Sequence, residues 1–144
     1  MQKNKNRISR LAIVAIIISA IVTIFPTQIS NSSTNPSGDP VKATHLTDAE
    51  FSKTIKQGIT VVDFWATWCG PCRIQGPIID KVAADIGDKA VIAKLDVDKN
   101  KLTASKYNVR SIPTIIIFKN GIPVKRFVGV QQKQTLLNAI NSYL

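Results

Sequence analysis

The sequence predicts an α/β domain in which a mixed central β-sheet is flanked by helices on both faces. Two observations lead to this fold class. Apolar, β-branched runs first alternate with helical segments, as parallel strands joined by crossover helices do. The last two apolar runs are instead separated by Asn120 and Gly121, the strongest short signal for an antiparallel hairpin. Parallel pairing followed by a hairpin gives a sheet of mixed strand direction.

The first predicted helix runs from Thr47 to Gln57. Thr47 and Glu50 have the spacing of a capping box, and Gly58 ends the apolar pattern. The next run, 60–66, is apolar and β-branched at its start, which is typical of a strand buried on both faces. We therefore expect this strand at the centre of the sheet.

A long helix is predicted to follow from Cys69 to Ile86, where Gly87 stops it. Residues 91–97 are rich in β-formers and predict a second central strand, and residues 102–107 predict a short helix. The hairpin strands are predicted at 114–118 and 124–128. A closing helix then places three apolar side chains on one face, namely Leu136, Leu137 and Ile140.

Residues 1–27 are predicted to be a signal peptide or a signal anchor. The first ten residues carry four basic side chains and no acid, and 11–25 is almost wholly aliphatic. Fifteen residues make about 22 Å of helix against a hydrocarbon core of about 30 Å, so both outcomes stay open. We favour an anchor, because no Ala-x-Ala pattern follows. Residues 28–40, rich in Ser, Thr, Asn and Pro, predict a flexible linker to a domain at 41–144.

The formal net charge of +10 does not indicate a nucleic-acid-binding protein. Four of the positive charges precede residue 11, and the domain keeps 15 basic and nine acidic residues, a net charge of +6. These basic residues are spread singly and form no block interleaved with aromatic side chains. We therefore expect no nucleic-acid partner.

Cys69 and Cys72 are the only cysteines of the chain, and they stand at a predicted strand-to-helix junction. At the first turn of a helix, unpaired backbone amides and the helix dipole stabilise an anion, so Cys69 is the candidate nucleophile. Cys72 lies one turn along the same helix face, within reach of a disulfide. A zinc site needs about four ligands, but only His45 could join the two thiols. A structural staple would close too short a loop to constrain the unfolded chain.

Several segments together resemble the thioredoxin family over about residues 41–144. They are VVDFWATWCGPCR, VIAKLDVD, SIPT, FKNG and RFVG. The distance from Cys72 to Ile112 leaves no room for the insertion typical of cytochrome-maturation relatives, so the resemblance is to thioredoxin proper. It implies the thioredoxin fold and a dithiol that reduces disulfides without a cofactor or metal.

Two charged residues in the predicted central strands are candidates for proton management. Asp63 is costly to bury ionised within VVDFW, so its pKa should be raised and it should accept the proton of Cys72. The resemblance implies that Lys94 lies near this acid and moderates it. The simpler alternative is that Asp63 and Lys94 are strand residues whose side chains face solvent and take no part in proton transfer.

The resemblance also implies a substrate groove around the dithiol. Ile112 would pair through its backbone with an extended substrate segment, and Pro113 would follow a cis peptide bond. The remaining substrate-binding positions are Trp68, Gly70, Pro71, Gly129 and Val130. Gln75 and Gly76 depart from the family, which more often has apolar or small residues there, and this leaves partner preference open.

The sequence thus predicts an extracytoplasmic thiol-disulfide oxidoreductase, a monomer anchored by its N-terminal helix, or secreted if the segment is cleaved. Basic residues before the span place the domain outside the membrane. Its expected partners are exported proteins with disulfides and a membrane electron donor, because no dependable thiol pool exists there. An exported oxidase or isomerase, and a non-catalytic tethered peptide-binding module, are the alternatives.

Overall fold

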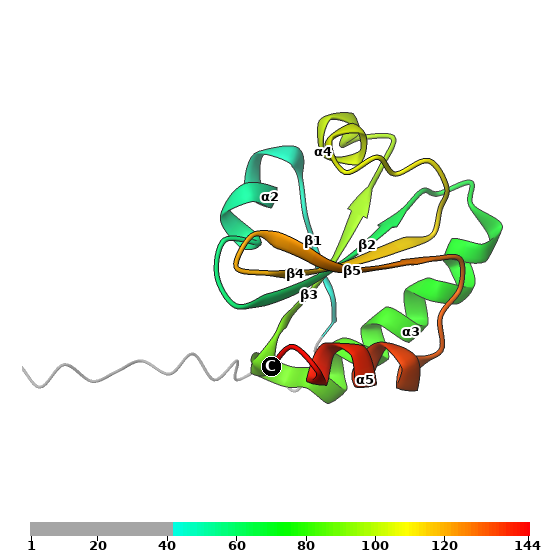
Figure 1. Ribbon diagram of the computed structural model, residues 1–144. Helices are drawn as coiled ribbons and strands as arrows, with labels where there is room; N and C mark the ends of the chain where they lie inside the picture. The colour runs from blue at the N-terminus through cyan, green and yellow to red at the C-terminus, as the bar shows by residue number, and fades with distance from the viewer. Residues whose placement is uncertain (1–41) are drawn as a thin grey trace, which may run out of the picture. The chain divides into compact units, whose positions relative to one another are not determined.

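A computed structural model describes residues 42–144 of the chain (Figure 1). The predicted signal or anchor at 1–27 and the linker at 28–40 lie outside the described residues. Within 42–144, no helix combines the length and the apolar character needed to cross a bilayer.

Five strands and four α-helices make up the described domain. The strands are β1 (Thr44–His45), β2 (Ile59–Trp65), β3 (Val91–Asp96), β4 (Thr114–Lys119) and β5 (Ile122–Val128). The helices are α2 (Asp48–Thr54), α3 (Gly70–Ile86), α4 (Lys101–Lys106) and α5 (Lys133–Asn141).

The strands form one mixed sheet in the order β1-β3-β2-β4-β5. The first three strands in this order run parallel, and β4 and β5 pair antiparallel. Asn120 and Gly121 join β4 to β5 with φ values of 50° and 84°. A two-residue hairpin turn of the twist-compatible type needs positive φ at both positions, and Asn and Gly adopt it most readily. The mixed sheet predicted from this turn is confirmed.

Helices cover both faces of the sheet, as predicted: α3 and α5 lie on one side, and α2 and α4 on the other (Figure 1). Successive side chains of β2 point to opposite faces, so each helical layer has its own core. The first core includes Val61, Ile79, Ile115, Leu136 and Ile140. The second includes Phe51, Val62, Phe64, Leu95 and Phe118. The strands between them are therefore apolar on both faces.

Two local predictions need correction. The first helix ends at Thr54 rather than Gln57, and the capping box does not form, because the Thr47 hydroxyl donates to the Glu50 carboxylate at 2.9 Å instead of accepting a backbone N–H. The two-residue strand β1 was not predicted. Its Thr and His show no apolar alternation, and only pairing with Ala93 and Lys94 of β3 makes it a strand.

Candidate redox site

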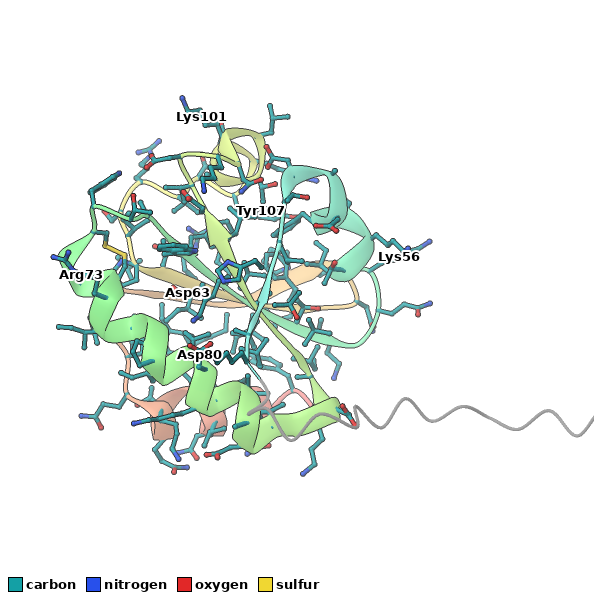
Figure 2. All side chains as sticks on the ribbon, turned by 180° about the vertical axis from the view of Figure 1, so that it is seen from behind. Lys56, Asp63, Arg73, Asp80, Lys101 and Tyr107 are labelled. Carbon is teal, nitrogen blue, oxygen red and sulfur yellow. A yellow bond between two sulfur atoms is a disulfide. The ribbon has the colours of Figure 1, made fainter. Side chains whose placement is uncertain are left out.

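The two cysteines form a disulfide at the N-terminal end of α3, with their Cα atoms 5.3 Å apart. Cys69 is the N-cap residue, and its sulfur accepts the backbone N–H of Cys72 at 3.2 Å. Pro71 occupies the first turn, where a missing N–H costs no helix hydrogen bond. Figure 2 shows the disulfide beside Arg73 at this end of the helix. The helix thus directs a backbone donor at the sulfur of the first cysteine.

Asp63 is buried in the centre of β2, on the face of the sheet that α3 covers. It is 1% exposed, and neither carboxylate oxygen has a hydrogen-bond partner among residues 42–144. Removal from water disfavours the charged form and raises the pKa of Asp63 to about 7. The predicted burial of this acid and the direction of its pKa shift agree with the structure.

Lys94 stands opposite Asp63 in the register of β2 and β3. Its ammonium group contacts Asp80 of α3 at 2.8 Å. The positive charge of Lys94 opposes the rise in the pKa of Asp63, and the negative charge of Asp80 adds to it. Lys94 is therefore a largely buried, paired residue and not a solvated strand lysine.

A pocket of about 260 Å³ joins the acid to the dithiol. Asp63, Cys72, Asp80 and Lys94 are among the residues that line it, and His45 of β1 lies at its wall. Since a water molecule occupies about 30 Å³ of liquid, this space has room for several. Asp63 and Cys72 therefore line one pocket, although both carboxylate oxygens of Asp63 are buried.

The loop before β4 and the loop after β5 meet beside the dithiol. The Ile112–Pro113 peptide bond is cis, as the resemblance implied. Ile112 packs against the cluster that contains both cysteines. The Gly129 N–H donates to the Pro113 carbonyl at 2.8 Å, and Gly129 has a φ of 83° that suits glycine. These contacts bring together three of the residues predicted for the substrate groove, Ile112, Pro113 and Gly129.

Apolar side chains are exposed around this site. Trp68, the residue before Cys69, is 68% exposed, and its indole N–H donates to the Asp98 carboxylate at 2.8 Å. Val130 is 42% exposed. Gly70 opens α3 between the cysteines, and an added Cβ there would contact no atom more closely than 3.9 Å. Every predicted site residue lies in the described domain.

Sequence reasoning missed two polar residues of α3. Asp80, the partner of Lys94, lies eight residues after Cys72, and this spacing of two i+4 steps on the dithiol-bearing helix was a signal for it. Gln75 was noticed only as a departure from the family. It is fully buried, and its side-chain oxygen accepts the backbone N–H of Gln131 at 2.7 Å.

A dithiol–disulfide pair at the start of a helix, beside a buried acid and a cis-proline loop, defines a thiol-disulfide oxidoreductase. The family model "Thioredoxin" matches residues 42–142. Thioredoxins of Staphylococcus aureus strains Mu50 and MW2 are 50% identical over 99 residues, which covers 69% of this chain and 95% of theirs.

Solved thioredoxin structures share the same fold. A mutant thioredoxin from Halobacterium salinarum NRC-1 is 33% identical with a TM-score of 0.66, and covers 74% of this chain and 95% of its own. Malassezia sympodialis thioredoxin is 34% identical with a TM-score of 0.66, and the match covers 72% of this chain and 94% of that one. The chain belongs to the thioredoxin family, and its fold is the thioredoxin fold.

Proposed function

We propose that this protein reduces the disulfides of exported proteins on the outer side of the cell membrane, where its N-terminal segment anchors it. The observation that carries the reductase chemistry is the position of Cys69. Its sulfur caps α3 and accepts the N–H of Cys72, an arrangement that stabilises a thiolate once the disulfide is reduced.

The reaction consists of two thiol–disulfide exchanges. The Cys69 thiolate attacks one sulfur of the substrate disulfide, and the other substrate sulfur leaves as a thiolate that takes up a proton. Cys72 then loses its proton and attacks Cys69 in the mixed disulfide, which releases the second substrate thiol. Two electrons pass to the substrate, and the protein ends with the Cys69–Cys72 disulfide seen in the structure.

Asp63 is the proposed acceptor of the Cys72 proton. A carboxyl with a pKa of about 7 exchanges protons readily at neutral pH, and the shared pocket connects the two side chains. Lys94 modulates this acid through its charge. Both roles are supported by burial and by proximity.

The exposed apolar rim is the proposed substrate groove. Trp68 and Val130 would contact substrate side chains, and the Ile112 backbone next to Pro113 would pair with an extended segment. A polypeptide could approach the sulfur atoms because the neighbouring groove positions carry small side chains or none, namely Gly70, Pro71 and Gly129.

A trapping experiment tests the chemistry. Cys72→Ser should accumulate mixed disulfides with exported proteins, because Cys69 still attacks and nothing resolves the adduct. Cys69→Ser is the matched control and should trap none. Absence of adducts from Cys72→Ser would favour the alternative of a non-catalytic binding module.

The proposed location rests on the sequence before the domain, where basic residues precede an apolar run and a polar linker. It also requires a membrane partner that supplies electrons, since the exterior offers no dependable thiol pool. The mass and membrane partition of the mature protein test it. Full-length protein in the membrane fraction, released when residues 1–27 are removed, would support the anchor; a shortened protein in the soluble fraction would contradict it.

The direction of electron flow is tested by redox titration of the dithiol. A reductant should show a potential near the value of about −270 mV known for thioredoxin. A value near about −120 mV, typical of strong oxidants, would replace the reductase with the oxidase alternative.

A further inference from the structure

We infer that Gln75 is a positioning residue that fixes one wall of the substrate groove relative to the dithiol, and so favours extended polypeptide disulfides over small disulfides. This inference rests on the proposed function and adds to it a positioning residue for polypeptide substrates. Its starting point is a polar side chain at a fully buried position of α3.

The Gln75 side chain connects the dithiol helix to the loop between β5 and α5. Its Oε1 atom accepts the backbone N–H of Gln131 at 2.7 Å, across 56 positions of sequence. Figure 1 shows this loop passing beside α3 on its way to α5. Because Gln75 lies one turn beyond Cys72 on the same helix, the bond fixes the loop with respect to the sulfur atoms.

Val130 lies between two anchored residues of this loop. On one side the Gly129 N–H donates to the Pro113 carbonyl, and on the other the Gln131 N–H donates to Gln75. The exposed Val130 side chain is thereby fixed between the cis-proline loop and the dithiol helix. A polypeptide that spans the groove contacts this wall, whereas a small disulfide needs only the sulfur of Cys69.

The stability of the fold alone does not explain the buried amide of Gln75. Within residues 42–144, the Gln75 Nε2 atom is buried without a hydrogen-bond partner, and an unsatisfied buried donor lowers stability. An apolar side chain of the same size would avoid this cost. An apolar residue would, however, lose the hydrogen bond from the Gln131 N–H, which connects α3 to the loop between β5 and α5.

Gln75→Met tests the inference, because methionine keeps the length and volume of glutamine but cannot accept the Gln131 N–H. Single-turnover reduction by the pre-reduced full-length chain is followed with insulin and with 5,5′-dithiobis(2-nitrobenzoic acid). The half-saturating insulin concentration should rise about threefold to tenfold, the range that loss of one hydrogen bond produces. The limiting rate, and the rate with the small disulfide, should stay within about twofold.

Ile79→Val is the matched control. Ile79 is a fully buried residue of the same helix that packs in the core rather than against the loop, so its truncation loosens α3 without touching Gln131. It should leave the half-saturating insulin concentration unchanged. An equal rise in this control would show that the Gln75→Met effect reflects general loosening, and would overturn the inference.

Hydrogen exchange of the unmodified protein provides a test that needs no variant. The Gln131 amide should exchange slowly; exchange at the rate of an unstructured amide would overturn the inference. Equal kinetics of Gln75→Met and the unmodified protein with both substrates would overturn the inference while leaving the reductase function intact. Failure of the unmodified protein to reduce either substrate would overturn both.

Discussion

At the scale of single residues, the site depends on one unpaired acid. Asp63 is buried on the α3 face of the sheet with no hydrogen bond to compensate it in the described domain, and its pKa rises to about 7. Such a group opposes folding whenever it is charged. The proposed proton exchange with Cys72, which lines the same pocket, would explain why an acid stands in an otherwise apolar strand.

The amount by which buried Asp63 lowers the free energy of unfolding should depend on pH. Well below pH 3.8 the carboxyl is protonated in both the folded and the unfolded chain, so its burial costs little stability. As pH rises from 4 to 7 only the unfolded chain ionises, and the folded state loses stability. A pKa raised from 3.8 to about 7 corresponds to a loss of about 4 kcal/mol above pH 7.

Asp63→Asn should therefore become progressively more stable than the unmodified oxidised protein as pH rises. Denaturant unfolding should show the difference in free energy of unfolding growing by about 3–4 kcal/mol between pH 4 and pH 8. A pH-independent difference would contradict the raised pKa. The same variant should slow the second exchange step more than substrate binding, in rapid-mixing kinetics from pH 6 to 9.

At the scale of elements, β2, β3 and α3 bring three charged groups together. β3 supplies Lys94 and α3 supplies Asp80, and their ion pair borders the pocket that contains Asp63. The two charges act on the pKa of Asp63 in opposite directions. Both elements therefore act on the pKa of Asp63, in addition to the larger effect of its burial.

Substitution of either charge should move the Asp63 titration in opposite directions. Lys94→Met should raise the pKa of Asp63, because a favourable positive charge is removed. Asp80→Asn should lower it, because a repelling negative charge is removed. Carbon-13 NMR of the Asp63 carboxyl measures both midpoints, and a shift of the same sign in the two variants would refute this coupling.

The sequence predicts a helix or strand boundary correctly where a single local signal determines the backbone conformation. Asn120 and Gly121 predicted the hairpin because few other residues tolerate positive φ at both turn positions. Gly87 marked the end of α3 at Ile86 correctly. Gly58 was less accurate, since α2 ends at Thr54. β1 escaped prediction because two residues become a strand only by pairing with β3.

The site was predictable to a similar degree. The dithiol and the buried acid could be found because a charged or reactive residue in an apolar strand or at a strand–helix junction is locally conspicuous. The Gln75 contact could not, since its partner is a backbone amide 56 positions away. Long-range contacts to backbone atoms leave no pattern in side-chain sequence.

At the scale of the whole molecule, one sheet connects two cores. Val61 faces the core beneath α3 and α5, and Val62 faces the core beneath α2 and α4. If either helical layer detached from the sheet, an apolar face of the same central strands would be exposed to water. The dithiol at the start of α3, which follows β2, is therefore positioned by elements that both cores stabilise.

A truncated protein comprising residues 42–144 should unfold in a single transition. Because both cores share β2, β3 and β4, tryptophan fluorescence and far-ultraviolet circular dichroism should report the same denaturant midpoint. Two separated midpoints would show that the helical layers are independent.

The most direct test of the account is the pH dependence of Cys69 alkylation by iodoacetamide in the reduced protein, measured with Cys72→Ser to isolate the first sulfur. Because Cys69 caps α3, the alkylation rate should reach half its maximum at a lower pH than the alkylation rate of free cysteine does. A midpoint equal to that of free cysteine would contradict the claim that the fold stabilises a thiolate at this position.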